Sequence, residues 1–189
     1  MDDDRLRREA SKLSPNDICA EILALSVVEY TYTPSLTISM ELGQSGGQLR
    51  DSGRGITITP DLGDTMSHAE RSHTCIYPSF SANPKVDSIL QELVWGERGA
   101  LGPALPTAAC LRYELVSERE GEKWTQRFQY GAPLGPPELL GPTSASGTTI
   151  TFETGGRIDH AAFAKLAETL CSRIPGLVIA IQAAPPSAR

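Results

Sequence analysis

The sequence lacks any long apolar run. Its longest apolar stretches, such as residues 177–181, are far shorter than the roughly 20 residues that a helix needs to cross a bilayer. The Asp-rich beginning of the chain also lacks the basic and apolar regions of a secretory signal peptide. We therefore expect a cytoplasmic protein that has no membrane partner.

Cysteine is scarce, and its spacing disfavours both a disulfide framework and a zinc site. The four cysteines are widely separated and form no CxxC pair: Cys19, Cys75, Cys110 and Cys171. We expect them to be reduced and mostly buried. Histidine, glutamate and cysteine do gather in the segment SHAERSHTC, residues 67–75, but their spacing matches no standard set of metal ligands. No metal site is expected there.

The chain also lacks an excess of positive charge. Its net charge is −6 and its pI is near 5.1, so it has no general electrostatic attraction for nucleic acid. The basic cluster of Arg5, Arg7 and Arg8 directly follows three aspartates, which is typical of a solvated tail. We expect no direct binding to DNA, and we expect residues 1–13 to form an N-terminal tail.

What remains is the composition of an ordinary globular protein, with 40% hydrophobic and 21% charged residues. The 189 residues are enough to bury a sizeable core, and no internal repeat interrupts them. The sequence therefore predicts one domain over residues 14–182, followed by a short C-terminal tail over residues 183–189.

A helix is predicted over residues 15–30. Ser14 can cap its first N–H groups, and the proline that follows is tolerated at the first helical position. Apolar residues recur at spacings of three and four, so one face should pack on a sheet: Ile18, Ile22, Leu25 and Val28. Glu21 falls on that same face. Because burial of an unpaired carboxylate is costly, either Glu21 has a function or this edge of the helix is wet.

The rest of the chain reads mainly as strands. A hairpin is predicted from residues 35–42 and 48–51, and an antiparallel meander from residues 110–118, 123–130 and 147–153, with a Pro/Gly-rich loop before the last of these. Between them lie a single helical turn near residues 67–71 and a helix over residues 85–95. Asp159 should cap a further helix, and residues 177–181 should form a final strand. The fold class expected is an α/β (α+β) two-layer sandwich, with helices on one face of a mixed, largely antiparallel sheet.

The segment DSGRGI, residues 51–56, follows the second hairpin strand and resembles the DxGxG motif of the GHKL ATPase superfamily, especially of its gyrase B members. The upstream helix with its central glutamate, the segment LRYELVSEREGEKWTQRFQYGAP and the later SGTTITF occur in the order and approximate spacing of that family. The resemblance covers nearly the whole chain, although residues 57–99 match poorly. It implies the Bergerat-type fold, which holds ATP between helices and sheet.

The resemblance assigns the adenine site to this motif. Asp51 matches the carboxylate that accepts a hydrogen bond from the exocyclic amine of adenine. Gly53 and Gly55 let the backbone turn and approach the base closely. Thr148 matches the threonine that supports the aspartate. The alternative interpretation is a simple strand-ending turn, because Asp, Ser and Gly all favour turns.

The resemblance also implies an ion pair beside the base. In the family an acidic residue on the first helix pairs with the arginine of the motif, and Glu29 and Arg54 occupy those positions here. Ile56, the last residue of the motif, is assigned to the ATP site with them. An exposed pair of this kind adds little stability.

At the phosphate end the resemblance is weaker. Glu21 matches the general base that activates the attacking water. The asparagine that holds Mg²⁺ one helical turn later in the family is Leu25 here, and leucine cannot ligate a hard cation. The segment GERGALG, residues 96–102, resembles a shortened phosphate lid, in which Gly99 and Gly102 can approach phosphate and Arg98 can add charge.

These residues leave several functions open. The first is adenine-nucleotide binding (ATP or ADP), with weak or absent hydrolysis and with Mg²⁺ lacking its usual protein ligand. The alternative is a nucleotide-free regulatory module that keeps the fold and binds a protein partner or forms a weak homodimer. A kinase-like GHKL protein ranks last, because residues 110–130 look more like gyrase.

Overall fold

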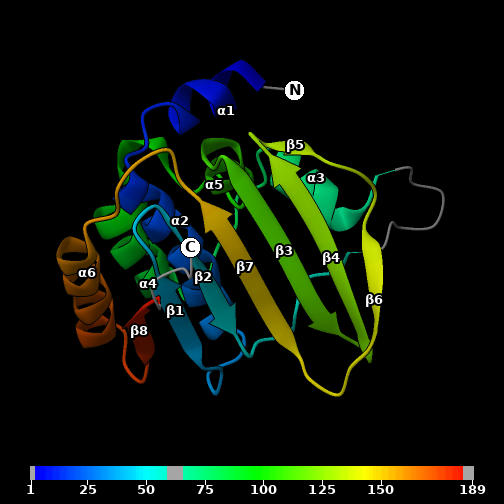
Figure 1. Ribbon diagram of the computed structural model, residues 1–189. Helices are drawn as coiled ribbons and strands as arrows, with labels where there is room; N and C mark the ends of the chain where they lie inside the picture. The colour runs from blue at the N-terminus through cyan, green and yellow to red at the C-terminus, as the bar shows by residue number, and fades with distance from the viewer. Residues whose placement is uncertain (1–2, 59–65, 185–189) are drawn as a thin grey trace.

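The computed structural model describes residues 3–58 and 66–184. Helices gather on one side of a twisted sheet, and the opposite side of the sheet is open (Figure 1). The helices are α1 (Asp3–Ala10), α2 (Pro15–Tyr30), α3 (His68–Thr74), α4 (Pro84–Leu90), α5 (Ala104–Ala109) and α6 (His160–Arg173). The strands are β1 (Ile38–Leu42), β2 (Gly46–Asp51), β3 (Arg112–Arg119), β4 (Glu122–Gln129), β5 (Ala132–Pro133), β6 (Glu138–Pro142), β7 (Gly147–Glu153) and β8 (Ile179–Ala183).

The sheet is mixed but mainly antiparallel. Its order is β5-β4-β3-β7-β2-β1-β8, and β6 pairs with β4 as well. Within the described ranges β1 and β8 form the parallel pair, while the other pairings are antiparallel. The predicted fold class, helices on one face of a mixed and largely antiparallel sheet, is therefore confirmed.

Helix α2 packs on the helix-covered face of the sheet, next to β2, and supplies much of the core. Ser14 accepts a hydrogen bond from the Asp17 backbone N–H at 3.2 Å, and Asp17 accepts one in return from the Ser14 N–H at 2.9 Å. This capping box satisfies N–H groups that the first turn leaves free. The helix then buries Ile22 and Leu23 completely against sheet residues such as Leu49 and Leu115.

The strand order that the predicted meander implies is wrong. Strand β7 does not follow β4 in the sheet but lies between β3 and β2. The Pro/Gly-rich stretch that was expected to be a loop forms β5 and β6, both of which pair with β4. These two short strands occupy the outer edge of β4, so β7 pairs with β3 instead.

The N-terminal segment also differs from its expectation. Residues 3–10 form helix α1, because Leu6 and Ala10 bury their side chains against Leu101 and Leu105 around α5. The arginines of α1 suggest a solvated tail, but an apolar residue every fourth position gives the helix a face that packs. Residues 185–189, which make up most of the expected C-terminal tail, lie outside the described ranges.

The expected helix over residues 85–95 is α4 followed directly by a π-helical turn, η1 (Gln91–Trp95), and a 3₁₀ turn, η2 (Gly96–Arg98). The single helical turn expected near residues 67–71 is a longer helix, α3. Helix α5 was not predicted. No helix in the described part of the chain combines the length and apolar character needed to cross a membrane.

Replacing Ser14 by alanine removes the cap of α2, and we expect the free energy of unfolding to fall by about 1 kcal/mol. Urea denaturation measures the change. The matched control is Ser172→Ala on α6, because Ser172 is exposed and donates only to the Thr169 carbonyl. Equal losses in the two variants would show that the capping box does not stabilise α2.

Candidate functional site

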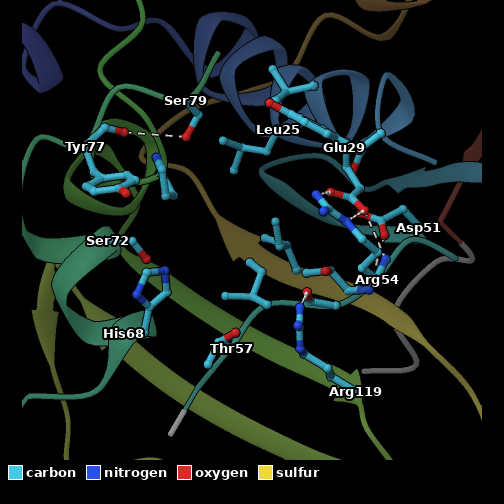
Figure 2. A pocket seen from close by; sticks show the side chains of 18 of the residues that line it. Leu25, Glu29, Asp51, Arg54, Thr57, His68, Ser72, Tyr77, Ser79 and Arg119 are labelled. Atoms are coloured by element: carbon cyan, nitrogen blue, oxygen red, sulfur yellow. Dashed lines mark hydrogen bonds and ion pairs between the residues drawn. The ribbon is translucent and has the colours of Figure 1, made fainter. Parts of the chain in front are cut away.

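A cavity of about 520 Å³ opens between helix α2 and the sheet. Figure 2 shows its two walls: Leu25, Glu29, Asp51 and Arg54 lie on one side, while His68, Ser72, Tyr77 and Ser79 lie on the other. The first wall comes from α2 and the end of β2, and the second from α3 and the chain that follows it. Residues far apart in the sequence therefore meet around one hollow.

Asp51 is a buried side chain of this cavity that accepts three hydrogen bonds. It is 4% exposed, and its Oδ1 accepts from the backbone N–H of Gly53 at 3.0 Å and of Thr148 at 3.3 Å. Its Oδ2 accepts from the Ser26 hydroxyl at 2.7 Å. Burial raises the pKa of Asp51, and these hydrogen bonds offset part of the rise. Thr148 lies directly opposite Asp51 in the β2–β7 pairing.

Glu29 and Arg54 form a two-pronged ion pair at the mouth of the cavity. The Arg54 Nε and Nη2 donate to the two oxygens of Glu29, each at 2.8 Å, and the Arg54 backbone N–H donates to the same carboxylate at 3.0 Å. The guanidinium also lies 4.8 Å above the ring of Tyr32. Burial by itself raises the pKa of Glu29, but the bonds from Arg54 outweigh it and lower the pKa below its ordinary value. The Arg54 side chain is 56% exposed, so the pair orients the loop more than it stabilises the fold.

The two motif glycines allow this tight loop. A Cβ on Gly53 would lie 2.6 Å from the Glu29 Cγ, and one on Gly55 would lie 2.6 Å from the Glu118 carbonyl oxygen. Gly55 also has a φ of +73°, which side-chain-bearing residues rarely adopt. The loop therefore has room for glycine at both positions and for no larger residue.

Ile56 and Gly55 line the cavity next to β3. The Ser117 hydroxyl accepts from the Ile56 N–H at 2.9 Å and donates to its carbonyl at 2.7 Å. Arg119 donates from Nη1 to the Gly55 carbonyl at 3.2 Å. These contacts tie the end of the motif to the sheet. Neither Ser117 nor Arg119 was singled out from the sequence, although both fall in the segment that carried the resemblance.

The wall formed by residues 77–80 was also missed. Tyr77, Ser79 and Phe80 line the cavity, and the Phe80 carbonyl accepts a hydrogen bond from the Tyr32 hydroxyl at 3.1 Å. This segment has no periodic pattern, and tertiary contacts bring it here: besides the bond from Tyr32, the Tyr77 N–H donates to the Leu101 carbonyl at 3.3 Å. His68 and Ser72 line the cavity from α3, whereas His73 is fully buried and stacks on Phe128.

Glu21 lies at the other end of α2, outside the main cavity. It is 3% exposed, and Arg98 donates to its Oε1 from Nε at 2.9 Å and from Nη2 at 2.7 Å. The same Nη2 donates to the Val94 carbonyl at 2.7 Å. The pKa of Glu21 is raised to about 7, because the effect of burial outweighs the lowering effect of the bonds from Arg98. Of the two sequence-based interpretations of Glu21, a function or a wet helix edge, the second is wrong, because this carboxylate is buried in an ion pair.

Leu25 connects the two ends of the site. It lines the main cavity and also a small hollow of about 10 Å³ that includes Glu21, Ser79 and Gly102. Gly99 lines neither hollow, although its neighbour Ala100 lines the small one, and a Cβ built on Gly99 would meet no atom beyond its chain neighbours within 4 Å. Among the described residues, no group of three or more His, Cys, Asp or Glu is placed to hold a metal ion.

The predicted site residues fall into groups according to the hollow that they line. Six of them line the main cavity: Glu29, Asp51, Arg54, Gly55, Ile56 and Thr148. Gly53 does not line the cavity, but its backbone N–H donates a hydrogen bond to Asp51. Glu21 and Gly102 line the small hollow, and Gly99 lines neither hollow.

The raised pKa of Glu21 predicts a pH-dependent stability. A carboxyl group whose pKa rises from its ordinary value of 4.5 to about 7 on folding binds its proton more tightly in the native state. Stability from this group is therefore present below about pH 4.5 and is lost as the pH rises towards 7.

Relative to Glu21→Gln, we expect wild type to lose about 1–3 kcal/mol of unfolding free energy between roughly pH 5 and pH 8. Urea denaturation at both pH values measures it, and the exposed Glu41→Gln serves as the control. A wild-type profile parallel to that of Glu21→Gln would show that the pKa of Glu21 is not raised.

Comparison with known proteins gives the site a context. Over 135 residues the chain is 27% identical to DNA gyrase B of Mycobacterium tuberculosis, and the match covers 70% of the chain and 19% of that protein. It is 27% identical over 140 residues to the B-type subunit of DNA topoisomerase 4 from Caulobacter vibrioides, covering 74% and 20% respectively. The chain thus spans about a fifth of the length of the curated relatives it matches. No protein-family model matches it.

The fold comparison agrees with the sequence comparison. The 43K ATPase domain of Thermus thermophilus gyrase B, solved in complex with an aminocoumarin, superposes with a TM-score of 0.65 and 19% identity. The match covers 88% of this chain and 42% of that one. The chain therefore resembles DNA gyrase B in sequence and has the fold of its ATPase domain, a GHKL-type ATPase fold.

Proposed function

We propose that the main cavity binds an adenine nucleotide, with Asp51 as the residue that recognises the base. The observation that carries this proposal is the arrangement of hydrogen bonds around its buried carboxylate. An ionised carboxylate has about four acceptor sites. Protein groups fill two on Oδ1 and one on Oδ2. The remaining site on Oδ2 suits the exocyclic amine of adenine, and guanine would present a carbonyl oxygen there instead, so a buried acceptor disfavours it.

The neighbouring residues support a planar ligand of this size. Thr148 and Ile150 provide the floor from β7, and Arg54 is held over the mouth by Glu29. A mostly preformed hollow with a few fixed polar groups is the usual form of a small-molecule site. The gyrase-B-type ATPase fold of the chain supports ATP or ADP as the occupant.

We further propose that hydrolysis is weak or absent. A general base must attract a proton, and the Arg98 guanidinium, which donates two hydrogen bonds to Glu21 Oε1, opposes protonation of this carboxylate. Mg²⁺ requires oxygen ligands in near-octahedral geometry. The residues around Glu21 are largely apolar, including Ala24, Leu25 and Trp95, and they do not fit such an ion.

The same ion pair favours an alternative, a regulatory module that keeps the fold without using nucleotide and acts through a protein partner or a weak homodimer. Under either function we propose that residues 14–182 form the functional domain and that the protein is cytoplasmic. The net charge of −6 supports a role without direct DNA contact.

Replacing Asp51 by asparagine should reduce ADP affinity at least tenfold and remove the preference for ADP over GDP, because the amide can present a donor to the base. Calorimetric titration measures both affinities. Glu41→Gln, an exposed change on β1, is the control and should bind as wild type does.

Wild type that binds no adenine nucleotide at millimolar concentration would overturn the proposal and leave the regulatory module. Equal affinity of wild type for ADP and GDP would remove the assigned role of Asp51.

A further inference from the structure

The two carboxylates on the cavity side of α2 mark the two ends of an elongated site. Glu29 lies beside the loop that holds Asp51, and Glu21 lies eight positions earlier on the same helix. At 1.5 Å per residue the two positions are about 12 Å apart along the helix. Leu25 stands midway and borders both hollows. This separation is comparable to the reach of an extended nucleoside diphosphate from its base to its last phosphate.

Because Leu25 and Ser79 line both the main cavity and the small hollow beside Glu21, a nucleotide whose base sits at Asp51 can extend its phosphates along α2 towards Glu21. Such a ligand brings several negative charges to a place where a buried carboxylate already lies. A positive group must compensate the charge at this end, because like charges in a poorly solvated site repel strongly.

A divalent cation does not suit the position. Within the described lining of the small hollow, Glu21 is the only carboxylate and Ser79 the only other oxygen-bearing side chain. Leu25, one turn after Glu21, has no oxygen in its side chain. A hard cation with a nucleotide takes many of its oxygens from phosphate and water, but it still needs a protein carboxylate as an anchor, and here Oε1 of the one carboxylate already accepts two hydrogen bonds from Arg98.

Arg98 lies at the Glu21 end of the site. Its guanidinium reaches Glu21 from turn η2, while its own side chain remains 20% exposed. The planar guanidinium presents donors that match phosphate oxygens as well as carboxylate oxygens. It is tethered to the Val94 carbonyl by one bond, so its position is set before any ligand arrives.

We infer that Arg98 replaces a metal ion as the positive charge that receives the nucleotide's phosphates, so that this chain binds adenine nucleotides without a divalent cation. The phosphates compete with Glu21 for the guanidinium. This inference rests on the proposed function, since it concerns the phosphate end of the same site.

The first test compares three ligands on the full chain by calorimetry: adenosine, ADP with Mg²⁺, and ADP with EDTA. We expect ADP to bind more tightly than adenosine, and its affinity to agree within about twofold with and without the metal. ADP affinity that falls about tenfold or more in EDTA overturns the inference while leaving the proposed function intact. Absence of binding by adenosine and ADP alike overturns both.

The second test removes the charge without burying an unpaired group. In the double variant Arg98→Gln/Glu21→Gln, two neutral side chains replace the pair. We expect its ADP affinity to drop about tenfold or more, because hydrogen bonds to a charged group are lost, while its adenosine affinity stays unchanged. The matched control is Arg173→Gln/Glu92→Gln, which removes an exposed Arg–Glu pair with a separation of 2.8 Å.

Two further variants separate charge from fold. Arg98→Lys should retain most of the ADP affinity, and Glu21→Gln alone should raise it, because the guanidinium then loses its competing carboxylate. Unchanged ADP affinity in Arg98→Gln/Glu21→Gln overturns the inference. So does an equal loss of adenosine and ADP affinity, which would show that the pair only supports the pocket's shape.

Discussion

The carboxylate of Asp51 joins the three elements on which the site depends. It ends strand β2, accepts from β7 through the Thr148 N–H, accepts from α2 through Ser26, and closes its own loop through Gly53. A buried carboxylate is stable only when its oxygens have partners, so the helix, the sheet and the loop must all hold their positions around it. The Glu29–Arg54 pair then fixes the outer side of the same loop.

The two ends of α2 use carboxylates in opposite ways. At one end Glu29 is partly exposed, and Arg54 lowers its pKa, so it serves as a stable anion that orients a loop. At the other end Glu21 is buried, and desolvation raises its pKa despite Arg98. The difference comes from solvent, because one pair lies at an open mouth and the other beside Trp95 and Ala100. One helix thus carries a partly exposed carboxylate that orients a loop, Glu29, and a buried carboxylate that is paired with an arginine, Glu21.

Elements with strong local signals were predicted well. The capped helix over residues 15–30, the first hairpin and the Asp159-capped helix all formed, because caps, turn glycines and hydrophobic spacing act within a few residues. The partners of strands were predicted poorly: β7 pairs with β3 because β5 and β6 occupy β4's outer edge. Strand neighbours depend on contacts distant in sequence, which periodicity does not record.

Local patterns were enough to predict the fold class, whereas the resemblance of the DSGRGI segment and its surroundings to the GHKL family predicted the candidate site residues Asp51, Thr148, Glu29 and Arg54. Two features of the site depend instead on tertiary packing: residues 77–80 form the facing wall, and Arg98 engages Glu21 from 77 positions away. Both follow from how α2, α3 and the turns after α4 pack against one another, and packing of that kind is a property of the whole chain.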